Sequence, residues 1–218
     1  MLIHFDRAFS EISAEDFVRN LKKDFRQIQS VCVGSTFTFG HKRNGNVELL
    51  RKLGRELQFT VHGLAAIALD GERVSSTRIR DAIIAGNFDA ASQMLGRAYS
   101  LCGKIVEGDR FGRKLGFPTA NLDVGGLALP PKGVYAAHAE VSGKIHRAVL
   151  NIGYRPTLEN RELQLRVEAH LLDFSGEIYG KEMEITFAEK LRDEQKFASV
   201  EDLKKQIERD IAAALRVF

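Results

Sequence analysis

The sequence predicts an α+β protein built from two dissimilar parts. Residues 1–95 alternate helix-like and strand-like segments, residues 96–187 hold short strands separated by turn residues, and the chain closes with an amphipathic helix. Alternating helices and strands are typical of a parallel α/β sheet, whereas successive short strands are typical of an antiparallel barrel or sandwich. The 218 residues correspond to between one and two domains at about 150 residues each.

The first part is expected to hold helices around a small sheet. Ser13 and Asp16 resemble a capping box ahead of the first helix, although Asp replaces the usual Glu or Gln. A second helix from Val47 is expected to end at Gly54, and a third, capped by Ser76, to run to about Ala85. Only two segments are convincing strands, which predicts a small sheet; they are 31–33 and 57–61.

The second part is expected to be all strand until its closing helix. The predicted strands are 99–107, 133–141, 144–151, 165–172 and 182–187. Ser142 and Gly143 separate the second from the third at the two-residue distance of a tight hairpin. Ser199 is placed to cap the closing helix, whose apolar stripe is formed by Leu203, Ile207 and Ile211.

Composition excludes several classes of protein. The net charge of +3 falls within residues 1–100, and residues 101–218 carry equal numbers of basic and acidic side chains. A nucleic-acid partner is therefore not expected. The longest apolar run, 64–69, is too short to span a membrane, and no secretory pattern opens the sequence. Cys32 and Cys102 fit neither a disulfide framework nor a metal site, so nothing points outside a reducing cytoplasm. We expect a cytoplasmic protein with no membrane partner, and we expect it to be a monomer.

The densest chemical signal is the segment GDRFGRKLGFPTANL, residues 108–122. Gly108, Gly112 and Gly116 allow backbone amides to converge on an anion. Three cations stand in the same segment, namely Arg110, Arg113 and Lys114. The segment has neither Walker A spacing nor the setting of a dinucleotide fingerprint, and an ordinary surface turn is the alternative interpretation.

The residues that follow favour a phosphate and magnesium site. In an extended segment, Thr119 and Asn121 lie on one face because side chains alternate along a strand. A hydroxyl and an amide carbonyl are hard, neutral oxygen donors that suit Mg²⁺ already bound by nucleotide phosphates. Pro118 fixes its own φ angle and stiffens the approach.

At this point the sequence resembles the riboflavin kinase domain of the bacterial bifunctional riboflavin kinase/FAD synthetase family. Besides GRKLGFPTANL, the matching motifs are PKGVYA (131–136), NIGYRPT (151–157), RVEAHLLDF (166–174), IYGKEMEITF (178–187) and LRDEQKF (191–197). The resemblance covers residues 96–218 and implies a six-stranded antiparallel Greek-key barrel with a C-terminal helix. It also implies transfer of a phosphoryl group from Mg-ATP to the ribityl 5′-hydroxyl of riboflavin, giving FMN.

The resemblance assigns roles residue by residue. Thr119 and Asn121 would hold Mg²⁺, and Glu168 would be the catalytic base. The residues implied in nucleotide binding are Gly108, Gly112, Arg113, Lys114, Gly116, Pro118, Thr119 and Asn121, and those implied in flavin binding are Asn151, Arg192 and Glu194. The alternatives are that Glu168 belongs to a solvated polar face with Arg166 and His170, and that the protein binds flavin or nucleotide without turnover. A third alternative is an oligonucleotide-binding barrel, which the balanced charge of residues 101–218 disfavours.

Residues 1–95 resemble a later part of the family's FMN adenylyltransferase module. The matching segments are VGSTFTFGHKRNG (33–45) and VSSTRIRDAI (74–83). The residues Ser75, Ser76, Thr77 and Arg80 cluster at a predicted helix start, which suits a phosphate site or simply a capped helix. The His-x-Gly-His motif of that module does not occur in the 218 residues. We therefore expect residues 1–95 to be an N-terminally truncated module whose FAD synthetase activity is lost or impaired, followed by a kinase domain over 96–218.

Overall fold

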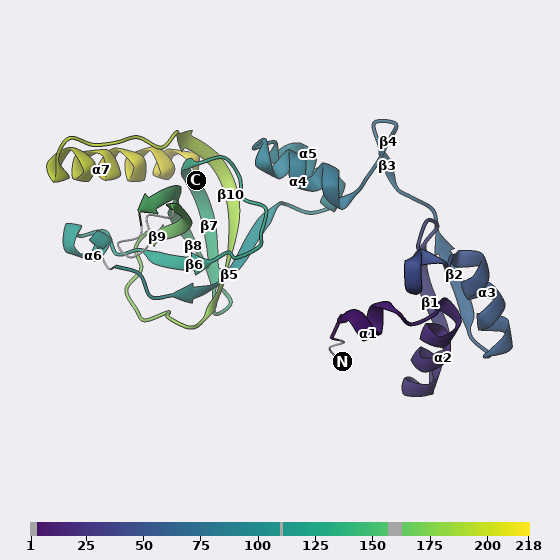
Figure 1. The fold of residues 1–218 in the computed structure, drawn as a ribbon. Coiled ribbons are helices and arrows are strands. Elements are labelled where there is room, and N and C mark those ends of the chain that lie inside the picture. The colour runs from purple at the N-terminus through teal and green to yellow at the C-terminus, as the bar shows by residue number, and fades with distance from the viewer. Residues whose placement is uncertain (1–3, 110, 157–162) are drawn as a thin grey trace. The chain divides into compact units, whose positions relative to one another are not determined.

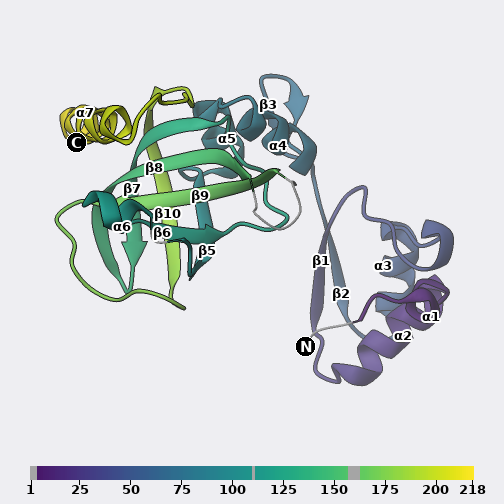
Figure 2. The same cartoon turned by 60° about the vertical axis from the view of Figure 1, so that its left-hand side comes forward.

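The chain forms two compact units, 1–74 and 75–218, each with its own apolar core. The structure, a computed structural model, describes residues 4–109, 111–156 and 163–218 (Figures 1 and 2). None of the helices within these ranges combines the length and apolar character that crossing a membrane requires.

The first unit is a small parallel sheet with helices packed on it. Strands β1 (Ser30–Gly34) and β2 (Thr60–Leu64) pair in parallel, which confirms the predicted small sheet. The helices are α1 (Arg7–Ser10), α2 (Ala14–Asp24), η1 (His41–Arg43) and α3 (Val47–Glu56), and a further pair of strands is β3 (Ala68–Leu69) with β4 (Glu72–Arg73). Apolar side chains of α2, of α3 and of the residue just before β2 contribute to its core, including Val18, Leu50 and Phe59.

Two local predictions in this unit have different outcomes. The Ser13 hydroxyl accepts a hydrogen bond from the Asp16 amide at 3.0 Å, so the predicted cap of α2 is confirmed. The predicted end of α3 at Gly54 is wrong, because the helix continues to Glu56. A Cβ on Gly54 would lie 2.7 Å from the Phe59 carbonyl oxygen. The glycine is therefore required by close packing inside the helix and does not terminate it.

The second unit is built on a closed six-stranded antiparallel barrel in the order β10-β5-β6-β9-β8-β7. Its strands are β5 (Ser100–Val106), β6 (Ala120–Asp123), β7 (Gly133–Val141), β8 (Lys144–Pro156), β9 (Leu163–Leu171) and β10 (Glu182–Arg192). This confirms the barrel implied by the resemblance. The interior is filled by fully buried side chains such as Tyr135, Leu150 and Met183, so the barrel has a packed core. The residue pattern alone missed β6, whose four residues are too few to show a period.

The turn between β7 and β8 is as predicted. Ser142 and Gly143 have φ angles of +53° and +74°. Two successive positive φ angles are typical of the tight hairpin turn whose twist matches the flanking strands. This turn sets the long β7–β8 register, in which Val134 lies opposite Asn151.

Helices α4 (Ser76–Ile84) and α5 (Phe88–Leu95) lie within the same compact unit as the barrel. The Phe88 ring stacks on Phe187 at 5.0 Å and on Tyr99 at 5.8 Å between ring centroids. The Tyr99 hydroxyl donates to the Ala128 carbonyl at 3.1 Å, and burial raises the pKa of this phenol to about 12. Packing therefore joins α5 to the barrel.

Helix α7 (Val200–Val217) lies along the outside of the barrel against β7, β8 and β10 (Figures 1 and 2). The Ser199 hydroxyl accepts from the Asp202 amide at 3.1 Å, which confirms the predicted cap. Ala214 and Ile211 pack on Val134, Ala136 and other outward-facing barrel side chains. The outer face of β7 and β8 thus packs in part on α7 and in part lines the cavity described below.

Candidate active site

Three of the predicted site residues form a row across adjacent strands. Asn121 on β6 lies opposite Glu168 on β9, and Glu168 lies opposite Asn151 on β8. The neighbours of Glu168 along β9, Val167 and Ala169, are fully buried in the barrel core. Because side chains alternate along a strand, the three polar side chains point to the outside of the barrel.

The same row continues over the next two strands. Asn151 pairs with Val134 on β7, and Val134 pairs with Arg192 on β10. Five strands thus contribute one outward-facing residue each to a continuous band. The barrel registers bring together residues that are far apart in sequence.

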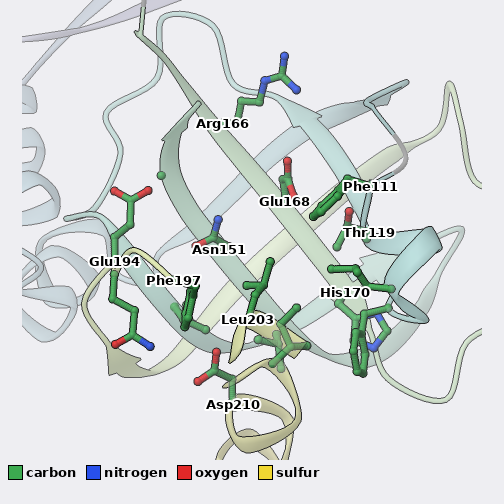
Figure 3. A pocket seen from close by; sticks show the side chains of 18 of the residues that line it. Phe111, Thr119, Asn151, Arg166, Glu168, His170, Glu194, Phe197, Leu203 and Asp210 are labelled. Carbon is green, nitrogen blue, oxygen red and sulfur yellow. The ribbon is translucent and has the colours of Figure 1, made fainter. Parts of the chain in front are cut away.

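A cavity of about 340 Å³ lies over this row, and we call it the first cavity (Figure 3). The predicted site residues that line it are Gly112, Thr119, Asn121, Asn151, Glu168, Arg192 and Glu194. One wall comes from α6 (Phe111–Leu115) and Phe117, and another from Phe197 and the α7 residues Leu203, Ile207 and Asp210. Figure 3 shows Thr119, Glu168 and Asn151 on the same side of the sheet, facing this space.

A second cavity, of about 430 Å³, adjoins the start of β6. Arg113, Pro118 and Thr119 line it together with the segment 174–179 and the β9 residues Ala169 and Leu171. Thr119 lines both cavities. Thr119 is therefore the predicted metal-binding residue that borders both spaces.

Two glycines of the predicted loop allow it to lie against the site side chains. A Cβ on Gly108 would come within 2.7 Å of Asn121 Cγ, and one on Gly112 would clash with the Phe117 carbonyl oxygen and lie 3.3 Å from Thr119 Oγ1. The loop is more regular than predicted because it contains the short helix α6, which ends before Gly116 at a φ of +93°. The glycines thus bring the loop backbone against Asn121 and Thr119.

The other residues predicted to bind the nucleotide from this loop do not line either cavity. Lys114 is exposed and lines neither cavity, as is also true of Gly116, and Gly108 borders the site only through Asn121. Two residues of the predicted motifs, Arg110 and Thr157, lie outside the described residues.

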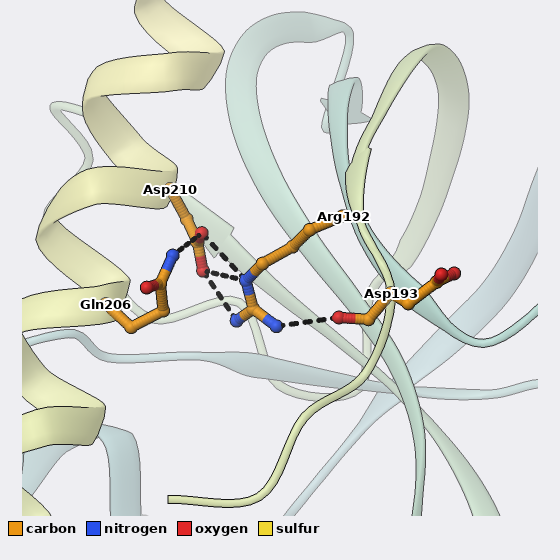
Figure 4. Close-up of polar contacts among 4 residues, drawn as sticks. All are labelled: Arg192, Asp193, Gln206 and Asp210. Atoms are coloured by element: carbon orange, nitrogen blue, oxygen red, sulfur yellow. Dashed lines mark hydrogen bonds and ion pairs between the residues drawn. The ribbon is translucent and has the colours of Figure 1, made fainter.

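Arg192 is held by a buried ion pair (Figure 4). Its Nε lies 2.9 Å and 3.1 Å from the two Asp210 carboxylate oxygens, and its Nη2 lies 2.7 Å from Oδ2. The Asp210 side chain is 6% exposed and also accepts from Gln206 at 2.9 Å. The charge of Arg192 is therefore neutralised within the protein, and the pair joins β10 to α7 at the rim of the cavity.

The Glu194 side chain lines the first cavity and lies over Gly153 of β8, where there is no side chain to exclude it. Its Oε1 occupies the space that a Cβ on Gly153 would fill, and its Oε2 lies 3.8 Å from Lys132 Nζ. The side chain thus has both a steric reason for its position and a cationic neighbour.

Six charged or polar residues that line the cavity were not assigned to the site from the sequence: Asp109, Tyr154, Arg166, His170, Gln195 and Asp210. The alternation Arg166, Glu168, His170 already places three side chains on one face of β9. Asp210 falls on the apolar stripe of the closing helix, three residues after Ile207, and a carboxylate there indicates a buried partner. Both signals were present in the sequence.

Comparisons with known proteins agree with this geometry. A family model described as riboflavin kinase matches residues 95–218, and one described as FAD synthetase matches residues 1–78. The bifunctional riboflavin kinase/FMN adenylyltransferase of Haemophilus influenzae is 40% identical over 215 residues, which are 98% of this chain and 69% of the relative. That of Escherichia coli K12 is 37% identical over 219 residues, with 100% and 69% covered.

The chain belongs to the bifunctional riboflavin kinase/FMN adenylyltransferase family. A solved Streptococcus pneumoniae structure, described as a macrolide-efflux protein, is also similar, with a TM-score of 0.73 and 29% identity. The matched region spans 96% of this chain and 67% of the Streptococcus pneumoniae chain.

The donor set of this riboflavin kinase family member fits a magnesium ion carried by a nucleotide. Thr119 and Asn121 both line the first cavity and offer a hydroxyl and a carboxamide oxygen. Within the ranges that the structure describes, no group of three or more His, Cys, Asp or Glu side chains is arranged to hold a metal. Mg²⁺ keeps several waters and commonly takes phosphate oxygens as ligands, so few protein donors suffice.

The residues assigned to the adenylyltransferase phosphate site lie at the start of α4. Ser75, and not Ser76 as predicted, is the N-cap, and its hydroxyl accepts from the Arg78 amide at 3.3 Å. Ser76, Thr77 and Arg80 follow in the helix and line neither cavity. The capped-helix interpretation thus accounts for the Ser75 hydroxyl.

Proposed function

We propose that residues 96–218 transfer the γ-phosphoryl group of Mg-ATP to the ribityl 5′-hydroxyl of riboflavin and so make FMN. The observation that carries this proposal is that Thr119 lines both cavities, while Glu168 and Asn121, opposite each other on adjacent strands, line the first. Phosphoryl transfer between two bound substrates needs a donor and an acceptor aligned at one meeting point, with little covalent help from the protein.

The second cavity is the proposed nucleotide side. Arg113 contributes a cation there, and Pro118 and Thr119 form the edge nearest the row of polar residues. With Thr119 and Asn121 as its protein ligands, a bound Mg²⁺ would neutralise charge on the phosphate oxygens. The close packing of Gly108 on Asn121 and of Gly112 beside Thr119 supports this assignment, because it restricts the positions of the two side chains that would bind the ion.

The first cavity is the proposed flavin side. Its apolar wall, including Val134, Leu203 and Phe197, suits a flat aromatic ring, and Asn151 and Glu194 offer polar groups to the ribityl chain or ring edge. A volume of about 340 Å³ lies within the usual range of small-molecule sites, roughly 300–1,000 Å³. We assign Arg192 to shaping this wall, because its guanidinium is already paired with Asp210.

The proposed step uses Glu168 as the general base. The Glu168 carboxylate accepts the proton of the riboflavin 5′-hydroxyl as that oxygen forms a bond to the γ-phosphorus. The bond between the γ-phosphorus and the bridging oxygen breaks, and its electron pair leaves with ADP. Placement on a strand between two paired strands gives Glu168 the rigidity that such a role requires.

The test is direct. The purified chain is mixed with riboflavin, ATP and Mg²⁺, and the products are separated by chromatography; we expect FMN and ADP in equal amounts. The matched control is His138→Ala, which alters an exposed barrel histidine that lines neither cavity and should leave FMN formation unchanged. Binding of riboflavin without FMN would instead support the alternative of a non-catalytic flavin-binding protein.

We further propose that the 218-residue chain makes FMN without appreciable FAD. The segment matched by the FAD synthetase family model holds the residues Ser75, Ser76 and Thr77, but the sequence contains no His-x-Gly-His. The resemblance assigns that histidine pair to the nucleotide phosphates, and loss of one such electrostatic donor costs about 10²–10³-fold in rate. With excess Mg-ATP, FAD formation at a rate comparable to FMN formation would overturn this part.

A further inference from the structure

The two polar neighbours of Glu168 on β9 bind opposite ends of the same connection. Arg166, Glu168 and His170 all face the first cavity from β9. Arg166 contacts Asp109, near the start of the connection between β5 and β6 (residues 107–119). His170 contacts Pro118, near its end. The face expected as a possible solvated polar surface therefore makes specific contacts on both sides of Glu168.

The contact of His170 constrains Thr119. His170 Nδ1 lies 2.7 Å from the Pro118 carbonyl oxygen. A carbonyl oxygen only accepts, so Nδ1 is the donor. The same ring meets Phe117 edge to face at 5.9 Å between centroids. Because the Pro118 carbonyl belongs to the peptide group that carries the Thr119 amide, and proline fixes its own φ, the hydrogen bond limits where Thr119 can lie.

The contact of Arg166 fixes the other end. Arg166 Nη1 lies 3.1 Å from Asp109 Oδ2, and the two side chains are 27% and 57% exposed. An ion pair this accessible adds little to global stability, because solvent screens the two charges. Its consequence is local, because Asp109 directly follows Gly108, whose backbone packs on Asn121.

We propose that Arg166 and His170 are positioning residues that fix the two ends of the 107–119 connection around Glu168, and so hold Thr119 and Asn121 in place for phosphoryl transfer. The inference rests on the proposed kinase function for its catalytic consequence. Its structural content, that β9 holds the connection in the ligand-free protein, does not depend on that function. Neither residue is assigned a contact with the reacting atoms.

The first experiment measures amide hydrogen exchange in the ligand-free protein. In His170→Ala, Arg166→Gln and Asp109→Asn, residues 111–117 should exchange about 10-fold faster or more, since local opening no longer has to break the lost contact. Exchange in α7 serves as the internal reference for a folded barrel, and His138→Ala is the matched histidine control. Unchanged exchange of residues 111–117 in a folded His170→Ala protein would overturn the proposal, whatever its activity.

The second experiment uses the kinase reaction and a conservative replacement. His170→Ala should lower kcat about 10–100-fold, because misplacement by about 1 Å can cost 10²-fold, while KM for riboflavin stays within about twofold. An Asn side chain can place its amide N–H near Nδ1 and a Gln side chain cannot, so His170→Asn should restore most of kcat and His170→Gln should not.

The Arg166–Asp109 contact is tested by non-additivity. If both residues act only through one another, the double variant Arg166→Gln/Asp109→Asn should lose no more kcat than the worse single variant. Additive losses, or a failure of His170→Asn to restore kcat, would count against positioning. Absence of FMN from the wild-type protein would refute the proposed function but leave the exchange experiment decisive for the contacts.

Discussion

Replacement of Asp210 by Asn tests whether the Arg192–Asp210 ion pair at the rim of the first cavity holds α7 on the barrel. Asp210→Asn keeps the shape of the side chain and removes its charge. Arg192, 20% exposed at its side chain, would then face the barrel–helix junction without a counter-charge. We expect a large loss of stability, because breaking one partner of a buried pair typically costs 3–5 kcal/mol, and about 3 kcal/mol is expected here since one acceptor oxygen and some solvent access remain.

The corresponding change in melting temperature follows from size. A loss of 1 kcal/mol lowers Tm by about 2–4 °C in a protein of roughly 150–250 residues, so Asp210→Asn should lower it by roughly 6–12 °C. The chain has no tryptophan and four tyrosines, all of them between residues 99 and 179. Tyrosine fluorescence therefore reports the unfolding of the barrel unit alone, without interference from residues 1–74.

The matched control separates the pair from its individual charges. In Arg192→Met/Asp210→Leu both charges are replaced by apolar groups of similar volume, and this double variant should be far more stable than Asp210→Asn. A Tm for Asp210→Asn within about 2 °C of wild type would refute the reasoning. So would a double variant destabilised by the sum of its two single changes.

Three further predictions concern the reaction and the core. Glu168→Gln should lower kcat about 10²–10⁴-fold with nucleotide binding nearly intact, as measured by turnover and by titration with ATP; near-wild-type turnover would remove Glu168 from the mechanism. Thr119→Ala and Asn121→Ala should each raise the Mg²⁺ concentration needed at fixed ATP, and an unchanged profile in both would place the ion elsewhere. Burial raises the pKa of Tyr99 to about 12, above its value of about 10 when unfolded, so its contribution to stability is complete below pH 10 and is lost as the pH rises toward 12. Urea unfolding followed by circular dichroism across that range should show stability falling less steeply in Tyr99→Phe than in wild type.

Local chemistry in the sequence was sufficient for much of the second unit. Alternation predicted strands close to β5, β7, β8, β9 and β10, and Ser142-Gly143 predicted the hairpin because it stands at the two-residue spacing of a tight turn and glycine adopts a positive φ at little cost. The spacing of Thr119 and Asn121 on one extended segment likewise predicted their shared face, and both line the first cavity. The caps at Ser13 and Ser199 are equally local, since each bonds an amide three residues along the chain.

Strand pairing was decided only by the tertiary structure. Asn121, Glu168 and Asn151 become neighbours through the β6–β9 and β8–β9 registers, and no periodicity along one strand specifies which residue lies opposite on another. The same reason explains why the Arg192–Asp210 pair and the contacts of Arg166 and His170 were not predicted. The residue types indicated only polar or charged positions on a strand or helix, and the partner of each side chain became known only from the fold.

Residues 75–95 show most simply what the sequence pattern could not predict. Their sequence predicts one capped helix, from Ser76 to about Ala85, and indicates neither α5 nor the surface on which these helices pack; the expected division follows a change in periodicity near residue 96. In the structure the Phe88 ring stacks on Tyr99 and Phe187, and burial of these rings places the segment with the barrel. Helix formation depends on neighbours a few residues away, which the sequence determines; the surface that buries the helix depends on distant residues, which only the assembled barrel brings together.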